Sequence, residues 1–321
     1  MTSIRLLVTG GLGFIGSNFI NYWLKRYPDD YILNVDLCTY AADFNNIDKN
    51  LSSKNYHFIK EDICNEKRMS SLSKDVDIIV NFAAESHVDN SIENASSFVR
   101  SNYFGVYSLL EAARINDIRI HQVSTDEVFG SLRPESKEIF NENTKYDPKN
   151  PYSATKAAAD HLVRAYVNTY GVKATISNCS NNFGPNQHRE KLIPKTILNA
   201  LSGKRIPVYG SGMNIRDWIY VEDHCSGIDA VITRGRMGET YLIGARNERT
   251  NLEVIKLILS KLKKSENLIE FVEDRKGHDY RYSLDPSKIE RELGWKPSYD
   301  FQEGISITIN YYNEKFMKTV K

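Results

Sequence analysis

One short stretch of the chain carries the residue types that acid and base chemistry needs. A predicted strand, 119–123, is followed within two positions by a hydroxyl and two adjacent carboxylates, Thr125, Asp126 and Glu127. Two carboxyls at the end of a strand can divide the roles of acid and base when their surroundings give them opposite protonation states. The same residues are also typical of a turn or a helix N-cap, and the stretch alone does not decide between these interpretations.

A tyrosine and a lysine further along the chain could act with these acids. Tyr152 and Lys156 lie in an alanine-rich segment that follows Pro151, which predicts a helix. Their spacing on a helix places both side chains on one face, where the ammonium can lower the pKa of the phenol and bind a cofactor ribose. Packing of an aromatic ring against a lysine stem is the alternative for an arbitrary helix. The glycine pattern near the N-terminus favours the chemical interpretation.

The N-terminal segment has the pattern of a dinucleotide-binding strand, turn and helix. An apolar run at 4–9 enters a turn with Gly10, Gly13 and Gly16, after which apolar residues recur at helical spacing. Glycines permit a tight turn and close backbone approach, so amides at the helix N-terminus can face a pyrophosphate. Asp36 ends the next predicted strand, about 20 residues beyond the last glycine, where a carboxylate would accept hydrogen bonds from an adenosine ribose. This pairing predicts NAD rather than NADP.

Alternating strand and helix segments predict an α/β fold with a doubly wound parallel sheet of the Rossmann type. In such sheets ligands lie beyond the carboxyl ends of the strands, so Asp62, the loop 83–86 and Thr125 should share one rim. We expect the NAD-binding domain to span 1–178, with a returning segment at about 216–245. A smaller mixed C-terminal lobe for the substrate is expected to comprise about 179–215 and 246–321.

Composition excludes several classes of protein. The 42 Lys and Arg residues balance 41 Asp and Glu residues, so a nucleic-acid partner is not expected. No apolar run approaches the roughly 20 residues that cross a bilayer. The four cysteines lack metal-ligand spacing, His87 has no second ligand at a supporting spacing, and no signal peptide follows Met1. We therefore expect a cytoplasmic, reduced protein without a membrane segment and without a metal.

The combined motifs resemble the extended short-chain dehydrogenase/reductases, whose glycine spacing is the GxxGxxG found here. Within that group the chain is similar to the nucleoside-diphosphate-glucose 4,6-dehydratases over almost its whole length. Related epimerases keep the tyrosine and the lysine but generally lack the acidic pair. The similarity lies in Thr125-Asp126-Glu127, Ser180-Asn181-Asn182, Glu190-Lys191-Leu192-Ile193-Pro194, Arg216-Asp217-Trp218 and Gly277-His278-Asp279.

The resemblance implies an enzyme that binds NAD, removes water from a nucleotide-linked glucose and forms a homodimer. The dimer would form through the helix carrying Tyr152 and a helix at about 98–113. The implied catalytic residues are Thr125, Asp126, Glu127, Tyr152 and Lys156. The implied cofactor contacts are Gly10, Gly13, Phe14, Ile15, Gly16, Asp36, Thr39, Asp62, Ile63, Ala83, Ala84, Ser101, Tyr152, Lys156 and Asn182. The implied substrate contacts are Ser86, Thr125, Asn181, Lys191, Leu192, Pro207, Tyr209, Arg216, Asn251, Arg275 and His278.

The base of the nucleotide stays open between dTDP and UDP. Asn90, Thr155 and the stretch 184–187 are more similar to the UDP-glucose branch, whereas Glu85-Ser86 and the stretch 216–218 are more similar to the dTDP-glucose branch. An NAD-dependent sugar-nucleotide 4-epimerase is the alternative activity, and it would need the tyrosine and the lysine but not the acids.

Overall fold

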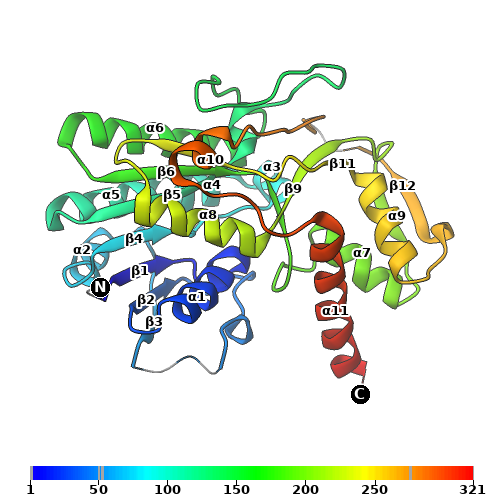
Figure 1. The fold of residues 1–321 in the computed structure, drawn as a ribbon, viewed down its shortest axis with the longest axis horizontal. Helices are drawn as coiled ribbons and strands as arrows, with labels where there is room; N and C mark the ends of the chain where they lie inside the picture. The colour runs from blue at the N-terminus through cyan, green and yellow to red at the C-terminus, as the bar shows by residue number, and fades with distance from the viewer. Residues whose placement is uncertain (1–2, 50, 52–53, 275–276, 321) are drawn as a thin grey trace.

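Seven parallel strands form the central sheet of the molecule (Figure 1). The structure, a computed structural model, describes residues 3–49, 51, 54–274 and 277–320. The strand order is β10-β6-β5-β4-β1-β2-β3. The strands β2 and β3 thus extend the sheet on one side of β1, and the strands from β4 onward extend it on the other side. This order confirms the predicted doubly wound sheet. The strands are β1 Arg5–Thr9, β2 Tyr31–Asp36, β3 Tyr56–Lys60, β4 Ile78–Asn81, β5 Arg119–Thr125, β6 Ala174–Cys179 and β10 Thr240–Ile243.

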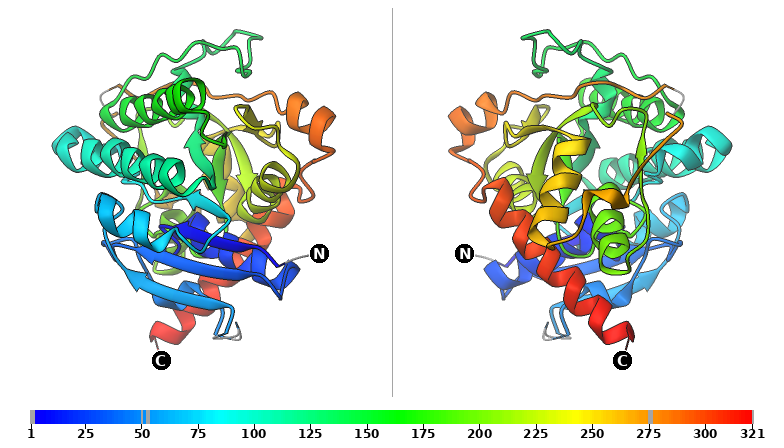
Figure 2. Two further views of the ribbon diagram at one scale, coloured as in Figure 1. Left: turned by 90° about the vertical axis from the view of Figure 1, so that its left-hand side faces the viewer. Right: turned by 90° about the vertical axis from the view of Figure 1, so that its right-hand side faces the viewer.

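Helices cover both faces of this sheet (Figure 2). One face carries α1 (Phe14–Arg26), α8 (Val221–Arg234) and α10 (Ser287–Leu293), whose apolar side chains share one core with the sheet. The other face carries α2 (Glu66–Leu72), α5 (Gly105–Asn116) and α6 (Pro151–Tyr170), which share a second core. The short helices α3 (Val88–Glu93) and α4 (Ala95–Val99) and the π-helical turn η2 (Arg100–Phe104) lead into α5.

A smaller lobe of mixed structure lies beside the sheet, as predicted (Figure 1). Its helices α7, α9 and α11 pack around an apolar core that includes Phe183, Trp218 and Ile305. The helix α10 lies within 246–321, a range predicted to belong to the smaller lobe. It packs instead on α8 and β10 of the sheet domain. The lobe elements are β7 Asn181–Phe183, α7 Leu192–Leu201, β8 Ile206–Tyr209, β9 Ile215–Tyr220, β11 Glu248–Thr250, α9 Asn251–Lys261, β12 Ile269–Val272 and α11 Phe301–Val320.

The start of α6 is fixed by a capping box. The side chain of Asn150 accepts a hydrogen bond from the Ser153 amide at 2.9 Å, and the Ser153 hydroxyl accepts one from the Asn150 amide at 3.2 Å. Pro151 occupies the first helical position, where its missing amide hydrogen costs nothing. These contacts place Tyr152 and Lys156 in the first two turns of a helix that packs against β5 and β6.

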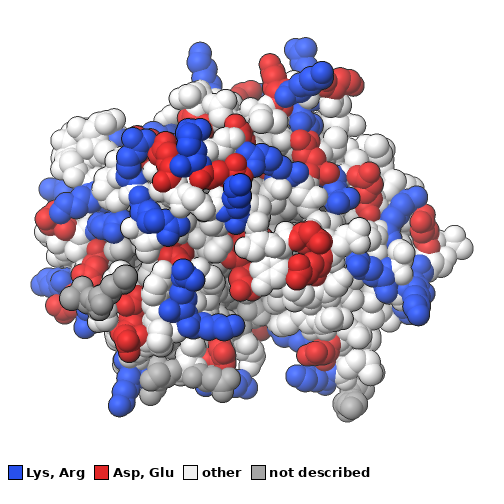
Figure 3. All heavy atoms as spheres, viewed as in Figure 1, with Lys and Arg blue, Asp and Glu red and all other residues white. Residues whose placement is uncertain are grey.

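Charged side chains of both signs are intermixed over the face of the molecule drawn in Figure 3. This distribution agrees with the balanced composition of the chain. None of the helices in the described part of the chain is long and apolar enough to cross a membrane. Short 3-10 turns lie at Phe44–Asn46 (η1), Asp126–Phe129 (η3) and Glu266–Leu268 (η4).

Candidate active site

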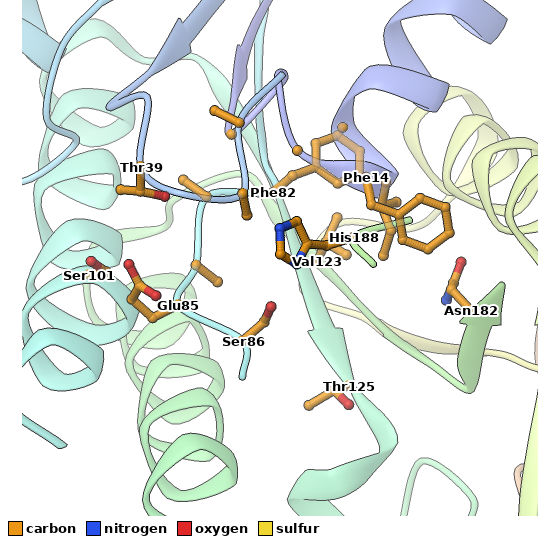
Figure 4. Close-up of a pocket in the computed structure, with 18 of the residues that line it drawn as sticks. Phe14, Thr39, Phe82, Glu85, Ser86, Ser101, Val123, Thr125, Asn182 and His188 are labelled. Carbon is orange, nitrogen blue, oxygen red and sulfur yellow. The ribbon is translucent and has the colours of Figure 1, made fainter. Parts of the chain in front are cut away.

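A cavity lies at the carboxyl ends of the central strands, at the rim that the sequence predicts (Figure 4). Every position that the resemblance assigns to the cofactor lines it. The strand ends and the loops that follow them contribute Gly10, Gly13, Asp36, Thr39, Asp62, Ile63, Ala83 and Ala84. The first turn of α1 contributes Phe14, Ile15 and Gly16, and the elements α6, η2 and β7 contribute Tyr152, Lys156, Ser101 and Asn182.

The glycine turn is shaped by close backbone approaches. Gly10 has a φ of +69°, and a Cβ atom there would lie 2.6 Å from the amide nitrogen of Ala83. A Cβ atom on Gly16 would lie 2.4 Å from the carbonyl oxygen of Gly10. Only glycine fits at both places. The turn therefore leaves the N-terminus of α1 open to the cavity, which fits a pyrophosphate group.

Asp36 and Asp62 occupy the second and third strand ends of this rim. The Asp36 carboxylate accepts hydrogen bonds from the amides of Leu12 at 3.0 Å and Cys38 at 2.8 Å, which hold it against the glycine turn. Each of its oxygens keeps a further lone pair for a ribose hydroxyl. Asp62 accepts a hydrogen bond from the guanidinium of Arg100 at 2.8 Å, and this ion pair lowers the pKa of Asp62 against the effect of its burial. These two hydrogen-bond acceptors suit the ribose hydroxyls on the adenosine side of a dinucleotide.

The end of β5 is at once a cap and a lining of the cavity. Thr125 is the N-cap of the short turn η3 and accepts a hydrogen bond from the amide of Glu127 at 3.3 Å. The cap interpretation of this stretch is thus confirmed, and the chemical one is compatible with it, because Thr125, Asp126 and Glu127 all line the cavity. The hydroxyl of Thr125 donates to Oδ1 of Asp126 at 3.2 Å.

The two acids have different surroundings. Asp126 is 1% exposed, and burial together with the charge of Glu127 raises its pKa well above the usual range. Burial also raises the pKa of Glu127, but the positive charges of Arg216 and Lys191 oppose that shift. Burial therefore favours the protonated form most strongly at Asp126, while Arg216 and Lys191 favour the ionised form of Glu127.

Tyr152 faces this acidic pair, and its environment differs from the prediction. Burial and the charge of Glu127 raise its pKa well above the usual range, while a hydrogen bond with Thr125 opposes the shift. The sequence predicts that Lys156 lowers the pKa of Tyr152. For the protein chain alone that prediction is wrong, because the pKa is raised. Lys156 is itself buried, which lowers the pKa of its ammonium, and its Nζ donates to the carbonyl oxygen of Val123 at 2.7 Å.

A second cavity continues from the first into the smaller lobe. Ser86, Asn181 and Lys191 line both cavities, and Nζ of Lys191 donates to the carbonyl oxygen of Ser86 at 3.1 Å. Thr125 lines the first cavity, and Arg275 lies outside the described residues. The other predicted substrate contacts all line the second cavity, namely Leu192, Pro207, Tyr209, Arg216, Asn251 and His278.

Arg216 is more constrained than an ordinary surface arginine. Its guanidinium donates to the carbonyl oxygens of Asp279 at 2.9 Å and Tyr280 at 3.2 Å, and it stacks over the ring of Tyr282 at 4.3 Å. The side chain is 7% exposed. These contacts fix the orientation of a buried positive charge at the wall of the second cavity, which suits an anionic ligand.

Comparison with known proteins agrees with this geometry. The profile of the family described as GDP-mannose 4,6 dehydratase matches residues 7–308. The chain belongs to this family.

Relatives of this GDP-mannose 4,6 dehydratase family member are similar over nearly their whole length. A dTDP-glucose 4,6-dehydratase of Mycobacterium tuberculosis strain H37Rv is 46% identical, with 99% of this chain and 96% of the relative aligned. The low-salt glycan biosynthesis protein Agl12 of Haloferax volcanii is 48% identical over 96% of this chain and 98% of the relative. The solved structure of DesIV, a dTDP-glucose 4,6-dehydratase from Streptomyces venezuelae with NAD bound, has a TM-score of 0.94 and 44% identity, and it covers 97% of both chains.

Several residues that line the first cavity were not among the predicted cofactor-binding, substrate-binding or catalytic residues. Tyr40, Glu85, His188 and Glu190 line the first cavity (Figure 4 labels Glu85 and His188). Oε1 of Glu190 accepts a hydrogen bond from the Tyr40 hydroxyl at 3.4 Å and lies 3.4 Å from Nδ1 of His188. Glu85 and Glu190 stand beside predicted residues within the matching motifs, so those motifs could have indicated them. Tyr40 and His188 carry no such signal.

The described part of the chain offers no obvious metal centre. No three or more of its His, Cys, Asp and Glu side chains gather in an arrangement that could hold a metal ion. His87 instead lies with its Nε2 atom 3.8 Å from Oε2 of Glu190.

Proposed function

We propose that this protein is an NAD-dependent nucleoside-diphosphate-glucose 4,6-dehydratase. It converts dTDP-glucose or UDP-glucose into the corresponding NDP-4-keto-6-deoxy-glucose and water, as in the biosynthesis of deoxysugars. The observation that carries the proposal is the pair formed by the buried Asp126 and the partly buried Glu127, which lies at the same strand end as Thr125 and faces Tyr152. A dehydrogenase centre alone explains oxidation, whereas the loss of water also needs an acid and a base.

The first part of the reaction is oxidation at C4 of the glucose. Tyr152 takes the proton of the 4-hydroxyl, and Thr125, which hydrogen-bonds to Tyr152, orients that hydroxyl. Burial opposes the phenolate form of Tyr152, so nearby positive charge is needed to stabilise it. Lys156, one turn further along α6, supplies a charge on the same face of the helix.

The second part is the loss of water. A carbonyl at C4 acidifies the proton at C5, which Glu127 removes as the base. Asp126, held in its protonated form by burial, gives its proton to the leaving C6 hydroxyl. These two roles need opposite protonation states; burial and the charge of Glu127 favour the protonated form of Asp126, whereas Arg216 and Lys191 favour the ionised form of Glu127. A proton returns to C5 when C6 is reduced, which completes the 4-keto-6-deoxy product.

The cofactor of this reaction is NAD. The glycine turn fits its pyrophosphate, Asp36 fits its adenosine ribose, and Lys156 and Tyr152 lie where they can bind the nicotinamide ribose. When bound, NAD+ supplies the chemistry of accepting a hydride from C4 and returning it at C6, so the overall reaction is redox-neutral. Two structures that are 43–44% identical to this chain are crystallised with NAD, which supports this choice.

The second cavity would hold the nucleotide. Lys191 and Arg216 provide positive charge for the diphosphate, Tyr209 provides an aromatic face for the base, and Ser86 lies near the glucose. Curated relatives named dTDP-glucose 4,6-dehydratase support dTDP-glucose as the preferred substrate. UDP-glucose is the alternative.

The assay that tests the proposal supplies dTDP-glucose and UDP-glucose in parallel, with no added NAD. We expect a 4-keto-6-deoxy product that absorbs in alkali, with no net accumulation of NADH in solution. A 4-epimerase would instead produce the epimer of the substrate without loss of water. Accumulation of that epimer would overturn the proposed function.

We also propose a homodimer and a cytoplasmic location. The helices α5 and α6 pack side by side, and large apolar side chains are exposed on them and on the adjoining turn η2, namely Phe104 on η2, Tyr107 on α5 and Tyr170 on α6. Such a face is typical of a surface that a second subunit covers. The cytoplasmic location rests on the unpaired cysteines Cys38, Cys64, Cys179 and Cys225 and stays a prediction.

A further inference from the structure

We propose that Asp160 is a positioning residue of the catalytic centre, whose buried carboxylate keeps Lys156 positively charged and ties the end of β5 to α6. The effect of Asp160 on catalysis rests on the proposed function. Its effect on the charge of Lys156 can be tested on the protein itself.

Four ionisable side chains form a column along one face of α6. Tyr152, Lys156, Asp160 and Arg164 recur at every fourth position, so each lies about one turn beyond the last. The column places a carboxylate between two cations, with the catalytic phenol at one end. The order of charges is what a buried lysine needs if it is to stay protonated.

Asp160 is fully buried, and burial raises the pKa of its carboxyl group; the charge of Lys156 and the hydrogen bonds that the carboxyl accepts oppose that shift and favour the ionised form. Oδ2 accepts bonds from the hydroxyl of Ser124 at 2.7 Å, the hydroxyl of Tyr146 at 2.9 Å and the side-chain amide of Asn178 at 3.2 Å. Three donors from three different segments converge on one oxygen, which a carboxylate can accept far better than a neutral acid. Arg164 stabilises the same arrangement by donating to the Tyr146 hydroxyl at 2.8 Å.

The donors of Asp160 also connect it to the reacting end of β5. Ser124 directly precedes Thr125, and Nδ2 of Asn178 donates to the carbonyl oxygen of Thr125 at 3.0 Å as well as to Asp160. The carboxylate therefore holds the strand end that presents Thr125, Asp126 and Glu127 against the helix that presents Tyr152.

Lys156 depends on this carboxylate for its charge. Its side chain is 5% exposed, and burial disfavours the ammonium. The groups that favour the charged form are Asp160 on α6 and the thiol of Cys179 on β6, and the carbonyl of Val123 on β5 accepts the hydrogen bond of Nζ. A buried thiol has a raised pKa and stays neutral, which leaves Asp160 as the compensating charge.

The test replaces Asp160 by a neutral side chain of the same shape and follows the Lys156 amine by 15N NMR across pH. In the wild-type protein the ammonium should persist through neutral pH. In Asp160→Asn its titration should move to lower pH by about one unit or more. The alkaline limb of kcat should move in the same direction, and kcat at neutral pH should fall about tenfold with KM little changed.

The matched control is Asp229→Asn. Asp229 is also a buried carboxylate of the sheet domain, and it accepts hydrogen bonds from the hydroxyls of Tyr22 at 2.9 Å and Tyr27 at 3.1 Å on the opposite face of the sheet. This variant should lower stability but leave the titration of Lys156 and the pH profile unchanged. A lysine titration that is equal in Asp160→Asn and the wild type would overturn the inference.

Two further outcomes keep the inference falsifiable. In a Lys156→Met background, Asp160→Asn should lower the residual rate less than it lowers kcat of the wild type, because only the tie between β5 and α6 is then left to lose. An equal loss in both backgrounds would show that Asp160 does not act through the charge of Lys156. If Asp160→Asn fails to fold, the wild-type spectrum still decides, because loss of the ammonium below neutral pH contradicts the inference. A wild type that forms no 4-keto-6-deoxy product would overturn the proposed function but not this titration.

Discussion

Thr125 and Asp126 are joined by a side-chain hydrogen bond of 3.2 Å, in which the threonine hydroxyl donates to Oδ1 of the carboxyl group. Oδ2 of Asp126 is buried and has no hydrogen-bond partner within the described part of the chain. A buried carboxyl with one open oxygen in a cavity is the arrangement that a proton donor requires. Thr125, Asp126 and Glu127 thus combine a local cap with an acid and a base, and their roles can be separated by mutation.

The acid and the base should have separable effects. In Asp126→Asn, loss of water should fall about 10² to 10⁴-fold, since the leaving hydroxyl has no proton donor. The C5 hydrogen of the bound sugar should still exchange with D2O, because Glu127 remains. Glu127→Gln should lose both the removal of water and the exchange at C5, because it has no base for the C5 proton. Mass spectrometry of the recovered sugar nucleotide measures both, and normal turnover of the double variant would contradict the assigned roles.

Tyr152 should be required for the first proton transfer. Tyr152→Phe should lower kcat about 10² to 10⁴-fold while the protein still folds and binds substrate, because only the hydroxyl is removed. The control is Tyr166→Phe on the same helix, whose hydroxyl donates to Glu111 at 2.7 Å, outside the cavity. Equal activities of the two variants in the product assay would refute the role of Tyr152.

A buried histidine should make the protein sensitive to acid. The two ring nitrogens of His121 lie 2.9 Å from the hydroxyl of Thr175 and 3.0 Å from that of Ser177, and burial lowers its pKa to about 3. The unfolded chain binds a proton below about pH 6.5, so stability is present above that pH and is lost as the pH falls toward the folded pKa. Between pH 7 and pH 5 this histidine should account for about 2 kcal/mol of lost stability.

Urea unfolding at the two pH values measures that loss. His121→Asn is less stable at pH 7 but should lose about 2 kcal/mol less than the wild type on acidification. The exposed His57, replaced in the same way, serves as the control and should leave the pH dependence as it is. An unchanged pH dependence in His121→Asn would show that another group is responsible.

The proposed dimer predicts a defined effect of one surface charge. Phe104→Asp places a carboxylate at the end of η2, where the chain enters α5, and should shift the protein to a monomer in analytical ultracentrifugation. Phe271→Asp is the control, because Phe271 is 58% exposed and Phe104 is 54% exposed, yet Phe271 lies on β12 of the smaller lobe. A Phe104→Asp protein that sediments like the wild type would rule out this surface.

The sequence predicted those features of the site that depend on local patterns. The glycine turn, Asp36 and the end of β5 lie where predicted, because a strand followed by particular residues fixes which side chains reach the rim of a parallel sheet. The spacing of Tyr152 and Lys156 correctly placed both on one helical face.

Features that depend on distant segments could not be predicted in the same way. The direction of the Tyr152 pKa shift was predicted wrongly, because helical spacing says nothing about burial or about the charge of Glu127. Arg216 opposes the rise in the pKa of Glu127, but the two residues lie far apart in the chain, so the sequence does not show that they are close in space. The same holds for the convergence of Ser124, Tyr146 and Asn178 on Asp160, which only the fold brings together.

The central claim is that one active site oxidises C4, removes water and reduces C6 of the same glucose. The most direct measurement supplies dTDP-glucose that carries deuterium at C4 and locates the label in the product by NMR. We expect a 4-keto-6-deoxy product with the deuterium at C6, transferred within one molecule. A product that retains its C6 oxygen, or a label that is lost to solvent, would contradict it.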